Sequence, residues 1–319
     1  MRKLIKTLFT LLILLGTFWL VVNIIPCKKV IDDNPFMKDE KTLISAHRGG
    51  ADLNPENTKR AFDYVIMETN YTDIVEIDVR TTKDNKLVVI HDETINRTGI
   101  KGDAEPVKIN DVNYLDLLKY NLGVNFENSL GEKPYEDYNI IKANLSGLTM
   151  MTLDEFLLRY YQHRDIKLYL EIKEDNEIGI KAADMALELL DKYSWWKERT
   201  MMISFSTAVV DHIIEVDKEQ LVGALGYKIA PELVLGLLSL NSLYKANYHG
   251  FQTQTVNKLG PIKVNCATKK IVKMAHKRNQ SITYWTINDQ QTMEELVDLG
   301  VDVITTNSPD VLAKVLGKI

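Results

Sequence analysis

Three carboxylates of this 319-residue chain are placed to bind a divalent cation. Glu76 and Asp78 lie two positions apart in a β-branched run, so both side chains would point to one face of a strand. Adjacent carboxylates repel unless a cation or a proton lies between them, and oxygen-only ligands suit Mg²⁺ or Ca²⁺. Glu171, near the end of another strand-like segment, would add a third ligand. Taken alone, a Glu-x-Asp pair is also common on solvated strand faces.

Two histidines and two basic side chains extend this set. His47 ends the first strand-like run and precedes Arg48, His91 ends a later run, and Lys173 follows Glu171 by two positions. Histidine suits acid–base chemistry near neutral pH, and Arg and Lys bind phosphate oxygens. A single histidine is more often structural, and Glu171 with Lys173 alone would be an ordinary ion pair. Together these residues predict metal-assisted cleavage of a phosphate ester.

These side chains lie at strand ends in a chain that alternates strand-like and helix-like segments. The helical patterns include Thr58 to Met67, after an N-cap-like Asn57, and Ile178 to Tyr193. Eight strands in this order predict an α/β fold, a TIM-type (β/α)₈ barrel with its active site at the carboxyl ends of the strands. An open doubly wound sheet is the alternative. The expected strands are 43–46, 74–79, 167–172, 201–204, 221–225, 250–252, 282–285 and 303–305.

Trp285 ends the seventh of these strands. Its indole would form an apolar wall for the carbon atoms of a substrate, or it would pack in the core.

A further strand-like run, Leu87 to Ile90, follows the second strand too closely for a parallel crossover, so the two should form an antiparallel hairpin. A turn centred between Asp84 and Asn85 would place Asp78 opposite His91. Residues 99–147 lack periodicity and are predicted to be an insertion on the barrel rim, with a short helix near 115–120.

The first thirty residues differ from the rest. From Thr7 to Cys27 the chain carries no charge and is long enough to span a membrane. Arg2, Lys3 and Lys6 precede this run and two lysines follow it, which favours a cytoplasmic N-terminus with the catalytic domain outside. A cleaved signal segment, a lipidated segment and a buried soluble helix are the alternatives. The predicted division is a cytoplasmic stub and transmembrane anchor at 1–28, a linker at 29–41 and a barrel at 42–319.

Composition excludes several classes of protein. The net charge is −5 and the isoelectric point is about 5.8, so bulk electrostatics do not favour a nucleic-acid partner. Two cysteines, Cys27 and Cys266, exclude a disulfide framework and a cysteine-rich zinc site.

Several motifs resemble those of the glycerophosphodiester phosphodiesterase family. SAHRGG, NPENT, EIDVRTTKDNKLVVIHDETINRTG, LYLEIK, SFS and YWTIN occur in the family's order and approximate spacing, from about Thr42 to the C-terminus. The resemblance implies hydrolysis of glycerophosphodiesters to glycerol 3-phosphate and an alcohol. It implies that His47 and His91 are the acid–base pair and that Glu76, Asp78 and Glu171 hold one divalent cation, Ca²⁺ or Mg²⁺. It also implies that Arg48, Lys173 and Trp285 bind substrate.

The chain departs from the family at two positions. The family's last strand often ends in Thr-Asp-x-Pro, whereas this chain has Asn307 in place of the Asp, and the SF segment is followed by Ser206 where the family often has Asp. Because we expect neither to touch the metal site, these changes should affect specificity rather than activity.

Other functions fit the same residues. The site could act on lysophospholipids, as a phospholipase D, or on glycerol-phosphate polymers of a cell wall. A catalytically silent binding module on a membrane tether would be expected to lack a histidine or carboxylate, and all are present. The partners expected are therefore a small-molecule or lipid-derived phosphodiester and, through the N-terminal helix, a membrane. The oligomeric state does not follow from the sequence.

Overall fold

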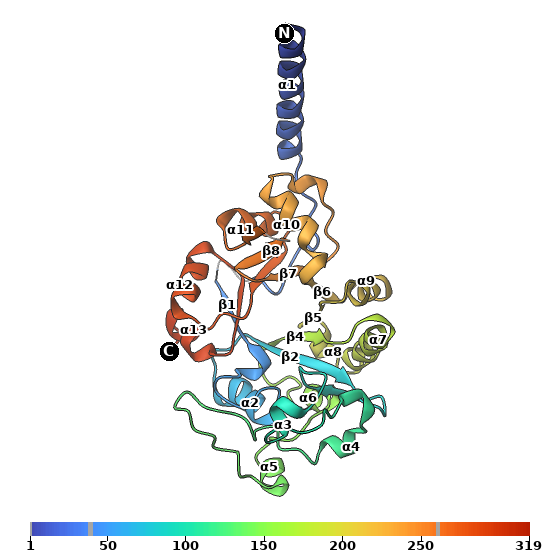
Figure 1. Cartoon of the computed structure of the whole chain (residues 1–319), viewed down its shortest axis with the longest axis vertical. Helices are drawn as coiled ribbons and strands as arrows, with labels where there is room; N and C mark the ends of the chain where they lie inside the picture. Colours follow the sequence, from blue (N-terminus) through green and yellow to red (C-terminus); the bar gives the residue numbers. More distant parts are fainter. Residues whose placement is uncertain (1, 38–40, 260–261) are drawn as a thin grey trace.

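A closed barrel of eight parallel strands is the centre of the computed structural model, which describes residues 2–37, 41–259 and 262–319 (Figure 1). The strands are β1 (Leu43–Ala46), β2 (Ile74–Thr81), β4 (Lys167–Ile172), β5 (Thr200–Ser204), β6 (Leu221–Ala224), β7 (Gly250–Thr253), β10 (Ser281–Tyr284) and β11 (Val303–Thr306). Their order is β1-β11-β10-β7-β6-β5-β4-β2, and pairing of β1 with β2 closes the barrel. This confirms the predicted TIM-type fold, and the alternative of an open sheet is wrong.

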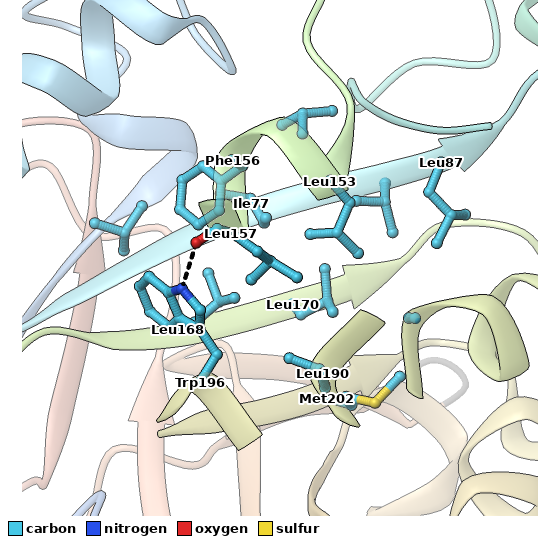
Figure 2. Packing of buried hydrophobic residues seen from close by; sticks show 14 of the residues in the cluster. Ile77, Leu87, Leu153, Phe156, Leu157, Leu168, Leu170, Leu190, Trp196 and Met202 are labelled. Atoms are coloured by element: carbon cyan, nitrogen blue, oxygen red, sulfur yellow. Dashed lines mark hydrogen bonds between the residues drawn. The ribbon is translucent and has the colours of Figure 1, made fainter. Parts of the chain in front are cut away.

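Helices cover the outside of the barrel. They include α6 (Leu153–Arg159), α7 (Asn176–Lys192), α8 (Ser194–Lys197), α9 (Thr207–Val216), α10 (Ala230–Leu237), α11 (Lys269–His276), α12 (Gln290–Leu299) and α13 (Pro309–Val315). Figure 2 shows the apolar layer between α6 and the strands, where Phe156 and Leu157 pack beside Trp196. The buried indole N–H of Trp196 donates to the carbonyl of Leu157 at 3.0 Å, so the one polar atom of this large side chain has a hydrogen-bond partner.

The helix after the first strand differs from the prediction. It consists of α2 (Lys59–Asp63) followed by a π-helical turn, η2 (Tyr64–Glu68). Its N-cap is Thr58, whose hydroxyl accepts from the Ala61 N–H, and not Asn57. The prediction at Asn57 was wrong because that residue has a φ of 54°, and its side chain bonds elsewhere.

The hairpin on β2 is present, with a register one residue away from the predicted one. β3 (Leu87–Val89) pairs antiparallel with β2, Thr81 opposite Leu87 and Val79 opposite Val89. Asn85 has a φ of 55°, which fits a three-residue loop closed by a left-handed residue. The Ile90 N–H therefore donates to the Asp78 carbonyl, and His91 lies one residue beyond that pair.

The segment 99–147 carries short helices that share a small apolar cluster with the hairpin strand β3 and the residues on either side of the segment. After α3 (Asn96–Gly99), these are η3 (Ile109–Asp111), α4 (Tyr114–Leu117), near the helix expected at 115–120, and α5 (Ile140–Leu145), which was not predicted. The buried residues of the shared cluster are Val88, Ile90, Ile95, Ile109, Leu117, Leu122 and Met150. Figure 1 shows the segment at the end of the molecule opposite α1 (Arg2–Ile24).

Inside the barrel, an apolar layer lies below the polar end. Ile74 and Tyr169 belong to one buried cluster that also includes Phe36, from the segment predicted to be a linker. The Phe36 ring stacks on Tyr169 with centroids 5.0 Å apart, and Asn34 donates to the carbonyls of His249 and Asn279. The chain before β1 is thus docked on the barrel, although residues 38–40 of the linker lie outside the described residues.

Replacing Phe36 with alanine should lower the free energy of unfolding by about 3–5 kcal/mol, because it empties a fully buried aromatic site. Urea unfolding of the barrel would measure this. The matched control, Asp33→Ala, changes an exposed residue of the same segment and should shift the free energy by less than about 0.5 kcal/mol. Equal stability of the two variants would contradict the packing role of Phe36.

The N-terminal helix α1 projects away from the barrel (Figure 1). Among the described residues it is the one helix long and apolar enough to cross a membrane, and its side chains are exposed apart from Val22. It meets the barrel near η5 (Asn241–Leu243): the Ser242 hydroxyl donates to the Val22 carbonyl at 2.6 Å. A membrane anchor and a signal sequence both fit this helix.

Candidate active site

Strand alternation and register bring the three carboxylates together. In β2, Glu76 and Asp78 follow Ile74 at two-residue steps and share its inward face. Asp78 pairs with Glu171 in the parallel register of β2 and β4. Oxygen atoms of the three side chains all lie within 4.8 Å of one another, and all three residues are buried.

The electrostatics of this cluster favour a bound cation. Burial, together with the neighbouring Asp78 and Glu171 charges, raises the pKa of Glu76 well above its usual value. Burial also raises the pKa of Glu171, although Lys173 opposes it. Asp78 Oδ1 is buried and accepts no hydrogen bond from the described residues. A carboxylate oxygen that accepts no hydrogen bond, beside two crowded carboxyls, is a suitable ligand set for a hard divalent cation.

Lys173 and Arg48 supply positive charge to the same cluster. Lys173 Nζ lies 2.6 Å from Glu171 Oε1 and 3.5 Å from Asp78 Oδ1. Arg48 Nε lies 3.3 Å from Asp78 Oδ2, and its backbone N–H donates to Glu76 at 2.8 Å. Burial opposes ionisation of Asp78, but Lys173 and Arg48 outweigh it and lower the pKa of that carboxyl.

The backbone after β1 makes this contact of Arg48 possible. Arg48 has a φ of 52° and Gly49 a φ of 82°, so the chain turns sharply just beyond the strand. A Cβ at Gly49 would lie 2.9 Å from Ala61 Cβ, in the helix that packs here. Glycine is therefore required, and the HRGG sequence holds the Arg48 N–H against Glu76.

Each histidine is oriented by a side chain that contacts its Nδ1 atom. His47 Nδ1 lies 2.6 Å from Asn307 Oδ1, and its Nε2 lies 4.0 Å from Glu76 Oε2. Burial, with the adjacent Arg48 charge, lowers the pKa of His47 to about 4, so this ring is neutral at pH 7. His91 Nδ1 lies 2.6 Å from Asp92 Oδ1. In both rings a bond at Nδ1 leaves Nε2 for a substrate.

The contact with Asn307 adds to one expectation. From the sequence, this departure from the family pattern was expected not to touch the metal site, and the contact that Asn307 makes is with the ring of His47. Its amide is neutral, so it orients the imidazole without adding a negative charge beside it.

Further residues around the site were not identified as functional from the sequence. Asn57 donates to Asp78 Oδ2 at 2.9 Å. Arg97 donates to both oxygens of Glu56 and to Asp92, while Glu56 also accepts from Arg48. Arg97 thus connects Asp92, which bonds His91, to Glu56, which bonds Arg48. Glu56 and Asn57 belong to the NPENT motif, and the motif was the available signal for their importance.

All the predicted site residues line a single cavity of about 190 Å³. They are His47, Arg48, Glu76, Asp78, His91, Glu171, Lys173 and Trp285, with Phe205 and Gln252 also at its wall. Trp285 lies just beyond β10, and its ring meets Phe205 edge to face with centroids 5.6 Å apart. The barrel therefore gathers carboxylates, cations, two histidines and an aromatic wall at one end.

Comparison with known proteins identifies the family. Residues 47–311 match the glycerophosphoryl diester phosphodiesterase family. The chain is 29% identical over 278 residues to a glycerophosphodiester phosphodiesterase of Caldanaerobacter subterraneus, covering 87% of this chain and 99% of the relative. It is 28% identical over 289 residues to a glycerophosphodiester phosphodiesterase of Bacillus subtilis, covering 88% of each.

Solved structures share the fold. A glycerophosphoryl diester phosphodiesterase of Silicibacter pomeroyi, described as putative in its own report, superposes with a TM-score of 0.69 at 18% identity, covering 89% of this chain and 96% of that one. An Oleispira antarctica phosphodiesterase, solved with the product sn-glycerol-3-phosphate, has a TM-score of 0.64 at 19% identity and covers 87% and 97%. With the match over residues 47–311, these findings place the chain in the glycerophosphoryl diester phosphodiesterase family, as a phosphoric diester hydrolase of glycerophosphodiesters.

Proposed function

We propose that the chain hydrolyses glycerophosphodiesters to sn-glycerol 3-phosphate and an alcohol, using His47 and His91 with one divalent cation. The observation that carries this proposal is the cavity in which both histidines face a buried carboxylate cluster and two basic side chains. The product found with the Oleispira antarctica relative supports the identity of the phosphate-containing product.

The two histidines divide the proton transfers. His47 is neutral at pH 7 and can take the proton from the attacking hydroxyl, which belongs to water or to the neighbouring glycerol carbon. His91, held by Asp92, gives a proton to the oxygen of the leaving alcohol. The new P–O bond forms as the P–O bond to the alcohol breaks, and Arg48 and Lys173 face the negative charge on the phosphoryl oxygens.

Glu76, Asp78 and Glu171 would hold the cation. A bound Mg²⁺ or Ca²⁺ supplies positive charge that neutralises the phosphoryl oxygens. The all-oxygen donor set and its burial favour these hard ions over softer metals. Trp285 and Phe205 would cover the carbon atoms of the substrate.

The N-terminal helix would anchor the barrel on a membrane. We propose residues 1–28 as a cytoplasmic stub and transmembrane anchor, 29–41 as the connection and 42–319 as the barrel outside the cell. The positive charges at Arg2, Lys3 and Lys6 support this orientation.

The direct test is release of sn-glycerol 3-phosphate from glycerophosphocholine by the full chain in detergent, with Mg²⁺ or Ca²⁺ added. We expect turnover with at least one of the two ions. Failure with both, on glycerophosphocholine and on glycerophosphoethanolamine, would reject the proposed substrates.

Asn307→Asp should move the acidic limb of the pH profile of kcat/KM upward by about 1–2 pH units. A carboxylate beside Nδ1 favours the protonated ring of His47, so its pKa rises and the neutral form is lost at a higher pH. Activity at pH 5 should therefore fall more than activity at pH 8. An unshifted acidic limb would contradict the role of His47 as base.

A further inference from the structure

A cavity of about 550 Å³ lies at the end of the barrel opposite the catalytic residues. Gln220 and His249 belong to its wall, and they directly precede β6 and β7. The catalytic cavity lies at the other ends of the strands, where His47, Lys173 and Trp285 directly follow β1, β4 and β10. Among the described residues, none lines both cavities. The cavity at the amino ends of the strands is therefore separate from the active site.

This cavity begins where helix α1 ends. Pro26 and Lys28 line it, just beyond Ile24, the last residue of the helix. Ser242 also belongs to the wall, and its hydroxyl donates to the Val22 carbonyl in the last turns of α1. Figure 1 shows α1 meeting the barrel here, beside α10. Residues that directly follow a membrane-spanning helix lie among the lipid head groups, so the cavity would lie at head-group depth.

Apolar side chains are exposed next to the wall of the cavity. Leu243 follows Ser242 and is 50% exposed, and Val216 precedes Asp217 and is 54% exposed. The two belong to different elements, η5 and α9. Apolar side chains exposed beside basic ones are typical of a protein face that rests on a bilayer. This end of the barrel is thus suited to contact the membrane that α1 would span.

The wall carries positive charge that the protein does not neutralise. Four lysines line the cavity: Lys28, Lys29, Lys218 and Lys245. All four are exposed, and none forms an ion pair with another of the described residues. Asp217, the one acidic residue among the described lining, is already paired with Lys197 at 2.8 Å. An anion in the cavity would relieve the repulsion among the lysines.

The inner wall offers a buried acceptor that has no partner. Gln220 is 1% exposed, and its Nε2 donates to the carbonyls of Thr200 and Leu221 at 2.7 and 3.1 Å. These two bonds fix the orientation of the amide, and its Oε1 accepts no hydrogen bond from the described residues. The neighbouring His249 accepts from the Val222 N–H at Nδ1, so the neutral ring carries its proton on Nε2. A ligand hydroxyl could donate to Gln220 Oε1 and satisfy it.

We propose that this cavity binds the head group of an anionic phospholipid, phosphatidylglycerol, from the membrane that α1 would span. The phosphate would lie among the lysines, and a hydroxyl of the head group would donate to Gln220 Oε1. A choline head group would place a cation among the lysines instead. The barrel would then rest on the bilayer by the amino ends of its strands, with the catalytic cavity facing away from the lipid. This inference rests on the proposed membrane anchor and goes beyond the proposed reaction.

The test titrates the full chain, in a neutral detergent, with phospholipids that share their acyl chains and differ in head group. Native mass spectrometry counts the lipids bound to each chain. One phosphatidylglycerol should bind at least about tenfold more tightly than phosphatidylcholine. It should also bind about threefold more tightly than phosphatidylethanol, which has the same charge and no hydroxyl. Equal affinity for phosphatidylglycerol and phosphatidylcholine would overturn the site, and equal affinity for the two anionic lipids would overturn the contact with Gln220.

Two double variants separate the cavity from the overall charge of the chain. Lys218→Glu with Lys245→Glu reverses two charges of the lining. Lys83→Glu with Lys133→Glu reverses two exposed lysines outside the lining, in the hairpin of β2 and β3 and in the segment 99–147. Affinity for phosphatidylglycerol should fall at least about tenfold in K218E/K245E and stay within about twofold in K83E/K133E. Equal losses in the two would overturn the assignment.

Turnover of glycerophosphocholine by the same samples distinguishes this inference from the proposed function. Both double variants lie outside the catalytic lining, so turnover should stay within about twofold of the unaltered chain. Turnover without a preference for phosphatidylglycerol would overturn the lipid site and leave the proposed reaction standing. Lipid binding without turnover would reject the reaction and leave the lipid site standing. A purified chain whose mass lacks α1 would reject the anchor, and with it the lipid site.

Discussion

Replacing His47 or His91 with alanine should lower kcat on glycerophosphocholine by about 10²–10⁴-fold while the barrel stays folded. Each ring is fixed at Nδ1, by Asn307 or Asp92, and lines the catalytic cavity. Neither ring belongs to the apolar core, so its loss should change the free energy of unfolding little. Measured rates of product release, with circular dichroism as the check on folding, test this.

A matched control exists on the outside of the barrel. His212 pairs with Asp184 at 2.6 Å and lies outside the catalytic lining, so His212→Ala should retain near-normal turnover. The double variant H47A/H91A should be little worse than the poorer single variant, because residues that act in one proton relay are not additive. Full activity in both single variants would reject the acid–base pair.

Removing the cation should cost at least about 100-fold in kcat, since positive charge at the phosphoryl oxygens contributes several kcal/mol. Glu171→Gln should have a comparable effect, because it removes a negative ligand from the cluster. Activity before and after exhaustive chelation, with Ca²⁺ or Mg²⁺ returned separately, measures the requirement and identifies the ion.

Thermal unfolding provides a second readout of the same cluster. A cation that binds the folded chain alone should raise Tm, and chelation should lower it. Without cation, Glu76→Gln should raise Tm. The pKa of Glu76 is raised in the folded state, so stability falls as the pH rises from the ordinary pKa of a Glu toward the folded one, and a neutral glutamine has no such cost. The same variant should lose most of the rise in Tm on adding the ion. If chelation left both turnover and Tm unchanged, the carboxylates would not be a metal site.

The sequence was sufficient for the barrel because its strands are short apolar runs with clear ends. All eight expected strands occur within one or two residues of their predicted bounds. The site followed from the same logic, since side chains at the carboxyl ends of parallel strands meet at one end of a barrel. Strand alternation and the register of β2 and β4 are enough to bring together the carboxylates of Glu76, Asp78 and Glu171.

The details that failed depend on backbone geometry that residue types specify weakly. A left-handed Asn85 lengthened the hairpin loop and moved its register by one residue. Asn57 has the composition of a helix cap but adopts a positive φ and bonds Asp78 instead. Asn307 and His47 lie near opposite ends of the sequence that forms the barrel. A local sequence pattern cannot predict a contact between two such distant residues.

The docked segment before β1 was missed for another reason. A single aromatic, Phe36, lies among Asp, Asn and Pro residues, so the stretch reads as polar and has no period. Its burial depends on Tyr169, which lies more than a hundred residues later in the chain.

That docked segment determines where a protease could separate the barrel from helix α1. Residues 25–26 and 28–29 are exposed between α1 and the barrel. The segment 30–36 is bonded to the barrel, beginning with the Val30 N–H, which donates to the Arg278 carbonyl. A cut before Val30 would shed a barrel that keeps Phe36 beneath its carboxylates. A cut after Phe36 would instead leave that aromatic on the discarded peptide and open the base of the barrel to water.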